Sequence, residues 1–130
     1  MKVLDIEIKK LGRERDVQIS RLKGVDLSHK EVYYHAGVIQ CKSCSRIDFE
    51  KSPICDHELK GRWSRDILAS FELFNELPIK KSYIVYINEY DKKIHEVKIG
   101  VFPHMEFKGD SFQDAVTQAY IFYKEKERNK

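Results

Sequence analysis

The sequence has no long hydrophobic run, few glycines and no large excess of charge of either sign. Its longest unbroken apolar stretches span only a few residues, whereas a helix that crosses a bilayer needs about 20, so a transmembrane helix is excluded. No apolar stretch follows Met1-Lys2-Val3, so no signal peptide is visible and we expect a cytoplasmic protein. The 6 glycines form no cluster, which excludes a glycine-rich phosphate-binding loop.

The charges are abundant but balanced. There are 24 Lys and Arg against 21 Asp and Glu, which gives a net charge of +3, and both signs are mixed along the chain. A dedicated nucleic-acid-binding protein usually shows a concentrated basic stripe, and this chain has at most a weak one. Because apolar residues make up 42% and recur along all 130 residues, the composition predicts one globular domain with a charged surface.

Catalytic motifs are also missing. The sequence contains neither H-E-x-x-H nor G-x-S-x-G, so the metalloprotease and hydrolase sites built on those patterns are excluded. Four histidines are scattered along the chain: His29, His35, His95 and His104. Each is more typical of a surface or strand position than of a general base. We therefore predict that the protein is not an enzyme; the alternative is Cys41 or Cys44 acting as a nucleophile with a histidine.

A cluster of cysteines is the most informative feature that the sequence does contain. Cys41, Cys44 and Cys55 lie within 15 residues, and His57 follows the last of them, giving the pattern C-x2-C-x10-C-x-H. An odd number of cysteines without a secretion signal argues against a disulfide framework. A C-x2-C turn lets two thiolates bind one ion, and the backbone N–H groups of the turn can point at the sulfurs.

These four side chains form a complete ligand set for zinc. Residues two apart in an extended chain face the same side, so Cys55 and His57 can bind together. Three thiolates and one imidazole fill a tetrahedral shell without leaving a position for substrate, which predicts one structural zinc ion. His35 is the reserve ligand if His57 does not bind. Two alternatives stay open: three reduced, buried cysteines, or a redox C-x2-C pair, although the latter lacks its usual strand-then-helix context.

Hydrophobic periodicity predicts three helices. Apolar residues at helical spacing favour a helix over residues 12–23, with a hairpin that turns near Gly12 as the competing interpretation. A second helix is expected over residues 65–77, with Ser64 as its N-cap. A third is expected over residues 111–126.

The helices at 65–77 and 111–126 are expected to cover one small sheet, so the predicted fold class is α+β. Alternating β-branched and aromatic residues predict antiparallel strands over 83–87 and 94–102. An extended segment near 32–40 leads into the cysteine loop and is a candidate for a further strand of the same sheet. The expected core residues are Phe71, Phe74, Val85, Ile87, Val97, Ile99, Ala119 and Phe122.

Three segments resemble the phage ABA sandwich domain family. The first has the family's pattern of an aromatic residue, Ser, any residue and Asp, followed on the same helix by an aromatic–Glu pair. The segments are Trp63-Ser64-Arg65-Asp66-Ile67 with Phe71-Glu72-Leu73 and Leu77; Gly109-Asp110-Ser111 with Ala115 and Ala119; and Gly12-Arg13-Glu14 with Asp16. Their order and spacing agree with the family over residues 11–24 and 63–124.

The resemblance implies an α-β-α sandwich in which helices cover a small antiparallel sheet. It also implies a small protein of a phage or prophage, in a family that has no general assigned activity. A weaker likeness to HicB-type antitoxins covers only the C-terminal third of the chain. We treat the chain as a single domain with an N-terminal helix and connector (1–40), a zinc loop (41–62) and an ABA-sandwich-like helix-hairpin-helix part (63–130).

The function predicted from these features is that of a zinc-binding accessory protein that acts by binding a host or phage protein. The alternative is a zinc-stabilised nucleic-acid-binding module or an antitoxin-like regulator, because basic residues and a tryptophan surround the zinc loop. The expected contact residues are Lys42, Arg46, Arg62, Trp63 and Arg65. A homo-oligomer is a further alternative, and no membrane partner is expected.

Overall fold

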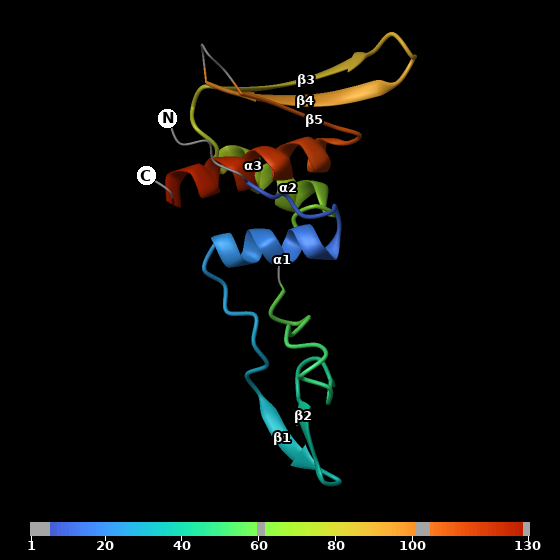
Figure 1. Cartoon of the computed structure of the whole chain (residues 1–130), viewed down its shortest axis with the longest axis vertical. Coiled ribbons are helices and arrows are strands. Elements are labelled where there is room, and N and C mark those ends of the chain that lie inside the picture. Colours follow the sequence, from blue (N-terminus) through green and yellow to red (C-terminus); the bar gives the residue numbers. More distant parts are fainter. Residues whose placement is uncertain (1–5, 60–61, 101–104, 129–130) are drawn as a thin grey trace. The chain divides into compact units, whose positions relative to one another are not determined.

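The chain is of the α+β class and divides into two compact units (Figure 1). The computed structural model describes residues 6–59, 62–100 and 105–128. The larger unit comprises Met1–Ile19 and Gly61–Lys130, and the smaller unit is Ser20–Lys60. Residues 41–60 of the predicted zinc loop lie in the smaller unit, together with residues 20–40. Within the described residues, no helix has the length and apolar character needed to cross a membrane.

The larger unit contains a three-stranded antiparallel sheet. Strands β3 (Lys81–Ile87), β4 (Lys93–Ile99) and β5 (Met105–Gly109) pair in the order β3-β4-β5. The predicted hairpin is confirmed, and its turn is closed by the side chain of Asn88, which accepts hydrogen bonds from the N–H groups of Tyr90 and Lys92.

The third strand of this sheet differs from the expected one. The third strand is β5, which the sequence analysis did not predict. Residues 32–40, the expected further strand, belong to the smaller unit. Met105 and Phe107 alternate with the exposed Glu106 and Lys108 along β5. The period-2 signal is therefore present, but only over five residues.

Both helices of the C-terminal part lie on the same side of this sheet (Figure 1). Helix α3 (Phe112–Arg128) contacts β4 and β5, and helix α2 (Ile67–Glu76) packs against α3. The core between them is apolar, and it confirms the expected burial of Val97, Ile99 and Ala119. Leu73 is also fully buried there, as are Val116 and Ile121.

The expected burial of α2 and β3 was partly wrong. Phe71 is 53% exposed, whereas Ala69, Ser70 and Leu73 are buried, because α2 packs against a helix and small side chains allow close approach. Phe74 and Phe122 are half-buried.

Val85 and Ile87 are exposed because they lie near the hairpin turn, and β5 pairs with β4 only from His95 onward. The sequence analysis expected the two helices to cover the sheet at these positions as well.

The N-cap of α2 is Asp66, not Ser64. The Asp66 side chain accepts a hydrogen bond from the N–H of Leu68, as an N-cap side chain does. Ser64 is buried and serves another contact, because its hydroxyl exchanges hydrogen bonds with the backbone N–H and C=O of Gly12, both at 3.0 Å. The N-cap was predicted from residue type alone. Because Ser64 and Asp66 are both residue types that cap helices, this criterion could not distinguish them.

Helix α1 (Arg13–Leu22) confirms the favoured helix over the competing hairpin, and its buried polar residues bind the rest of the larger unit. The Asp16 carboxylate accepts hydrogen bonds from the Ser64 N–H at 2.7 Å and the Arg65 Nε–H at 2.9 Å. Arg15 donates to the Asp114 carboxylate and, at 3.1 Å, to the Thr117 hydroxyl. The three segments on which the family resemblance rests therefore meet through polar side chains.

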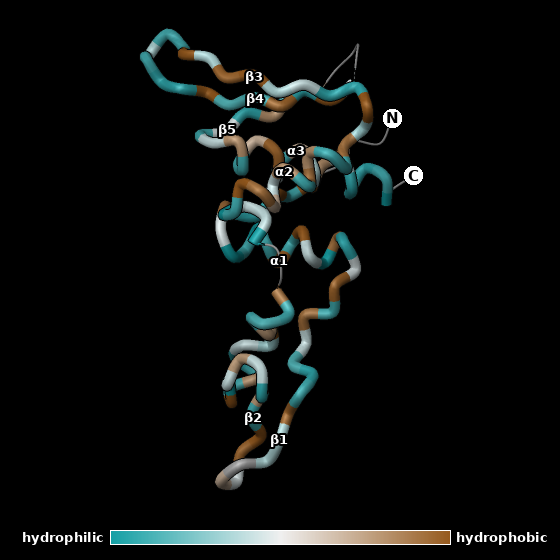
Figure 2. Tube along the Cα trace, turned by 180° about the vertical axis from the view of Figure 1, so that it is seen from behind, coloured by the Kyte–Doolittle hydropathy of each residue, from teal (hydrophilic) through white to brown (hydrophobic). Residues whose placement is uncertain are grey.

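The smaller unit is built on a β-hairpin of β1 (Val32–His35) and β2 (Val38–Cys41). Ala36 and Gly37 form its two-residue turn with φ angles of 50° and 80°, and two left-handed residues in succession suit the twist of a tight hairpin. The hydrophobic colouring of β2 in Figure 2 belongs to exposed side chains, since Val38 and Ile39 are not buried. Cys41 ends β2 and begins the cysteine loop.

Candidate metal centre

One histidine and all three cysteines of the smaller unit converge on one point. Each of His29, Cys41, Cys44 and Cys55 offers a ligand atom, and these atoms lie within 4.8 Å of one another. Cys41 and Cys55 are buried, while Cys44 and His29 are half-buried. The Sγ atoms of Cys41 and Cys55 are 3.8 Å apart, much farther than the roughly 2.05 Å of a disulfide bond. This group, the His/Cys3 cluster, can hold a metal ion.

The C-x2-C turn holds the first two sulfurs close together. The N–H of Cys41 donates to the Arg46 carbonyl and the N–H of Ser45 donates to the Cys41 carbonyl, both at 2.9 Å. Ser45 adopts a left-handed φ of 65°, which lets the chain reverse directly after Cys44. The loop is thereby closed by its own backbone.

The turn also favours the thiolate form of Cys41. The backbone N–H of Cys44 points at its sulfur and, as the largest cause, lowers the pKa of Cys41 to about 6. Burial acts oppositely on its neighbour and raises the pKa of Cys44. The thiolate is the metal-binding form of cysteine. With this lowered pKa, Cys41 is mostly thiolate at neutral pH and can bind a metal without first losing a proton.

Cys55 joins the cluster from a separate part of the loop. Its N–H donates to the Leu27 carbonyl at 2.7 Å, which ties it to the segment that precedes His29. Leu27 and Leu59 are both buried and are, with the cysteines, the main apolar residues of the unit's interior. The cysteine sulfurs are therefore a large part of the core of the smaller unit.

His29 is held with one ring nitrogen facing the sulfurs. Its Nε2 lies 2.8 Å from the Ser52 carbonyl, and its Nδ1 lies 3.3 Å from the Cys44 Sγ. Because a carbonyl only accepts, Nε2 carries the proton, and a neutral ring then has its lone pair on Nδ1. The Ser52 carbonyl raises the pKa of His29 as the largest cause. The Phe49 ring stacks on the imidazole with centroids 4.2 Å apart and fixes its plane.

His57, the expected fourth ligand, is not a member of the cluster and is exposed. Its prediction assumed an extended C-x-H segment, but the N–H groups of Glu58 and Leu59 both donate to the Cys55 carbonyl and close a turn. Residues two apart in such a turn point in different directions. The reserve ligand His35 ends β1, at the hairpin turn.

A sequence signal for His29 does exist in the hairpin register. Val32 pairs with Cys41 across β1 and β2, and the pairing continues because the Lys42 N–H donates to the Glu31 carbonyl. Extending the same register places His29 opposite Cys44. The predicted ligand set contains only residues close in sequence to the cysteines and assumes no hairpin turn at Gly37, so it omits His29.

The expected nucleic-acid or partner contact residues are divided between the units. Lys42 and Arg46 belong to the smaller unit, and Arg62, Trp63 and Arg65 belong to the larger one. Two of the guanidinium groups already face carboxylates: Arg46 lies 3.9 Å from Asp48, and Arg65 lies 2.9 Å from Asp16. These contacts reduce the positive charge that is free to bind phosphate.

Comparisons of the chain with protein-family models, with curated proteins and with solved structures find no match. The resemblance to phage ABA sandwich domains and the likeness to HicB-type antitoxins therefore stay predictions from the sequence.

Proposed function

We propose that this protein binds one structural zinc ion through His29, Cys41, Cys44 and Cys55, and that the zinc-ordered smaller unit binds another protein. The protein then acts as a non-enzymatic accessory protein. The observation that carries this proposal is the approach of four ligand atoms, from three separate stretches of chain, to within 4.8 Å of one another. The family resemblance makes a phage or host protein the expected partner.

The distances within the cluster support zinc. Two sulfurs bound to a tetrahedral zinc ion at about 2.3 Å are about 3.8 Å apart, and a sulfur and an imidazole nitrogen are about 3.5 Å apart. The cluster has 3.8 Å between the sulfurs of Cys41 and Cys55, and 3.3 Å between the sulfur of Cys44 and the nitrogen of His29. Three thiolates with one imidazole are also a ligand set that zinc prefers.

A structural role fits better than a catalytic one because the protein supplies all four ligands of a tetrahedral ion. The loop also needs such a stabilising element. Its large apolar side chains are Ile47, Phe49 and Ile54, and none of them is buried. Ordering a backbone costs roughly 1–2 kcal/mol per residue, so metal binding is expected to supply free energy that hydrophobic burial does not.

Protein binding is supported by the apolar side chains that the smaller unit exposes. Exposed apolar groups that lie close together are typical of interaction surfaces. On the hairpin and the loop they are Val32, Tyr33, Tyr34, Val38, Ile39 and Ile47, all at least 40% exposed. Tyrosines are common in such interfaces, because the ring is apolar and the hydroxyl can still form hydrogen bonds.

Elemental analysis of the full chain, purified without added metal, tests the proposed zinc ion. We expect one zinc per chain in the natural protein and a large loss in Cys44→Ser. Ser43→Ala, an exposed position on the same turn, is the matched control and keeps its zinc. A metal content far below one equivalent in the natural protein, with three titratable thiols, would refute the proposal.

A further inference from the structure

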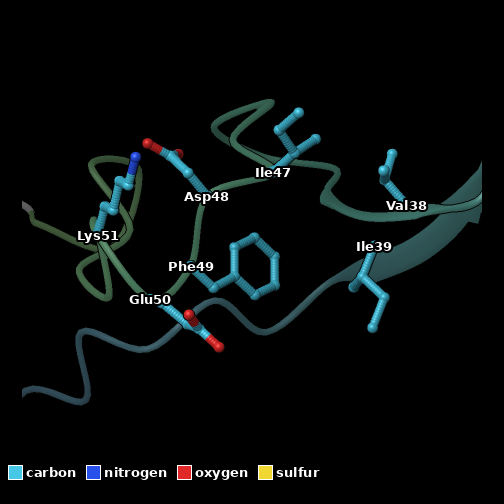
Figure 3. Close-up of a pocket in the computed structure, with 7 residues that line it drawn as sticks. All are labelled: Val38, Ile39, Ile47, Asp48, Phe49, Glu50 and Lys51. Atoms are coloured by element: carbon cyan, nitrogen blue, oxygen red, sulfur yellow. The ribbon is translucent and has the colours of Figure 1, made fainter.

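The smaller unit has a groove between strand β2 and the loop that follows the C-x2-C turn. Its lining residues are Val38, Ile39, Ile47, Asp48, Phe49, Glu50 and Lys51, and its volume is about 420 Å³ (Figure 3). We propose that this β2 groove binds a peptide segment of a partner protein in which a large apolar side chain stands next to a lysine or arginine. The proposal rests on the proposed function and names the chemistry of the partner.

The floor of the β2 groove is apolar. Val38, Ile39 and Ile47 are 40%, 42% and 55% exposed, so each has apolar surface that a partner can cover. Figure 3 shows the Phe49 ring between the loop and β2, directed toward the two β2 residues. A volume of about 420 Å³ lies near the lower end of binding-pocket sizes, which run from about 300 to 1,000 Å³. The groove therefore suits a few side chains of an exposed segment.

The rim of the groove carries a carboxylate for a cation of the partner. Asp48 lies 3.9 Å from the Arg46 guanidinium, so this carboxylate is that of Glu50, which Figure 3 shows pointing away from Lys51. Within the part of the chain that the structure describes, no cation lies at ion-pair distance from Glu50. A lysine or arginine of the partner supplies the complementary charge, whereas a nucleic-acid phosphate is repelled.

Phe49 connects the groove to the metal centre. Its ring stacks on His29, with the ring planes 9° apart, and His29 faces the Cys44 sulfur. Ser52 closes the loop around Phe49 and also contacts the histidine. The Ser52 N–H donates to the Asp48 carbonyl at 2.8 Å, and the Ser52 carbonyl lies 2.8 Å from the His29 Nε2 atom. Loss of the metal releases His29, and we expect the groove to lose its shape with it.

Selection from a phage-displayed library of random linear peptides on the zinc-loaded full chain tests the proposal. We expect enrichment of peptides with a large apolar residue beside a lysine or arginine. Fluorescence anisotropy with an enriched peptide then measures the effect of each variant. Ile47→Ser and Glu50→Lys are each expected to weaken binding by about tenfold or more. Glu31→Lys, at an exposed acidic position of the same unit outside the groove lining, is the matched control and leaves the affinity unchanged.

The zinc content of each variant separates the two proposals. Ile47 and Glu50 are not members of the His/Cys3 cluster, so both variants keep one zinc. A zinc-loaded natural protein that enriches no such peptide, or whose peptide binding is unchanged by Ile47→Ser and Glu50→Lys, overturns the groove proposal and leaves the zinc centre intact. Tight binding of a labelled oligonucleotide that competes with the peptide also overturns it. A natural protein without zinc refutes the proposed function instead.

Discussion

The Nδ1 atom of His29 lies 3.3 Å from the Sγ atom of Cys44, although 15 positions separate the two residues in the sequence. The β1–β2 hairpin brings them together, because its register runs outward from Val32 and Cys41. The hairpin therefore does more than connect two parts of the chain: it delivers one ligand from each arm to the same site. Any change that shifts this register by one residue would separate the pair.

Removal of the metal should disorder the smaller unit and leave the larger one folded. The larger unit has its own sheet and apolar core, whereas the interior of the smaller unit consists mainly of cysteines and two leucines. Hydrogen exchange with and without a chelator measures the effect by segment. We expect loss of protection over residues 41–57 and unchanged protection over β3, β4 and α3. Loss of protection in those strands and that helix would place the metal in the core of the whole protein.

Substitution within α2 should separate its buried side from its exposed side. Leu73→Ala is expected to lower the free energy of unfolding by about 2–5 kcal/mol, because the side chain is fully buried. Phe71→Ala should cost less than about 1 kcal/mol, because the ring is 53% exposed. Denaturant unfolding of both variants measures the difference. Equal losses would mean that the helix is rotated relative to the packing described above.

The Asp16 carboxylate should contribute strongly to the stability of the larger unit. The carboxylate is completely buried and accepts hydrogen bonds from the Ser64 N–H and Arg65 Nε. Asp16→Ala leaves a buried N–H without its acceptor, which is expected to cost about 1–3 kcal/mol. Glu14→Ala, an exposed acidic position on the same helix, is the control and should stay within about 0.5 kcal/mol. Thermal and denaturant unfolding compare the two, and similar losses would contradict a specific role for Asp16.

The sequence predicted elements well where one local pattern dominated. The helical spacing of residues 12–23 and 111–126 and the alternation around the hairpin turn at Asp91 led to α1, α3, β3 and β4. Cap identity in α2 was harder, because Ser64 and Asp66 are both good caps and the choice depends on the distant Gly12. The buried side of α2 depends on its packing against α3, which its own periodicity does not specify.

The metal site was predictable only where its ligands lie close together in the sequence. The three cysteines are close in sequence, and their clustering alone indicated a common ligand set. His29 is brought in by strand pairing, so it appears only when the Ala36-Gly37 turn and the register beyond Val32 are considered together. His57 was chosen from its distance in sequence to Cys55, and the turn that follows Cys55 removes the geometry on which that choice depended.

The most direct test of the zinc centre compares two histidine variants, His29→Asn and His57→Asn. Both remove one imidazole from the smaller unit, but only His29 lies in the His/Cys3 cluster, while His57 is exposed. Zinc affinity is measured by competition with a chromophoric chelator. Loss of a residue that only hydrogen-bonds to a metal ligand typically lowers metal affinity by about 10–100-fold. We therefore expect His29→Asn to lose at least that much zinc affinity, and His57→Asn to bind zinc as tightly as the natural protein. Full affinity in His29→Asn, with loss in His57→Asn, would contradict the ligand set proposed here.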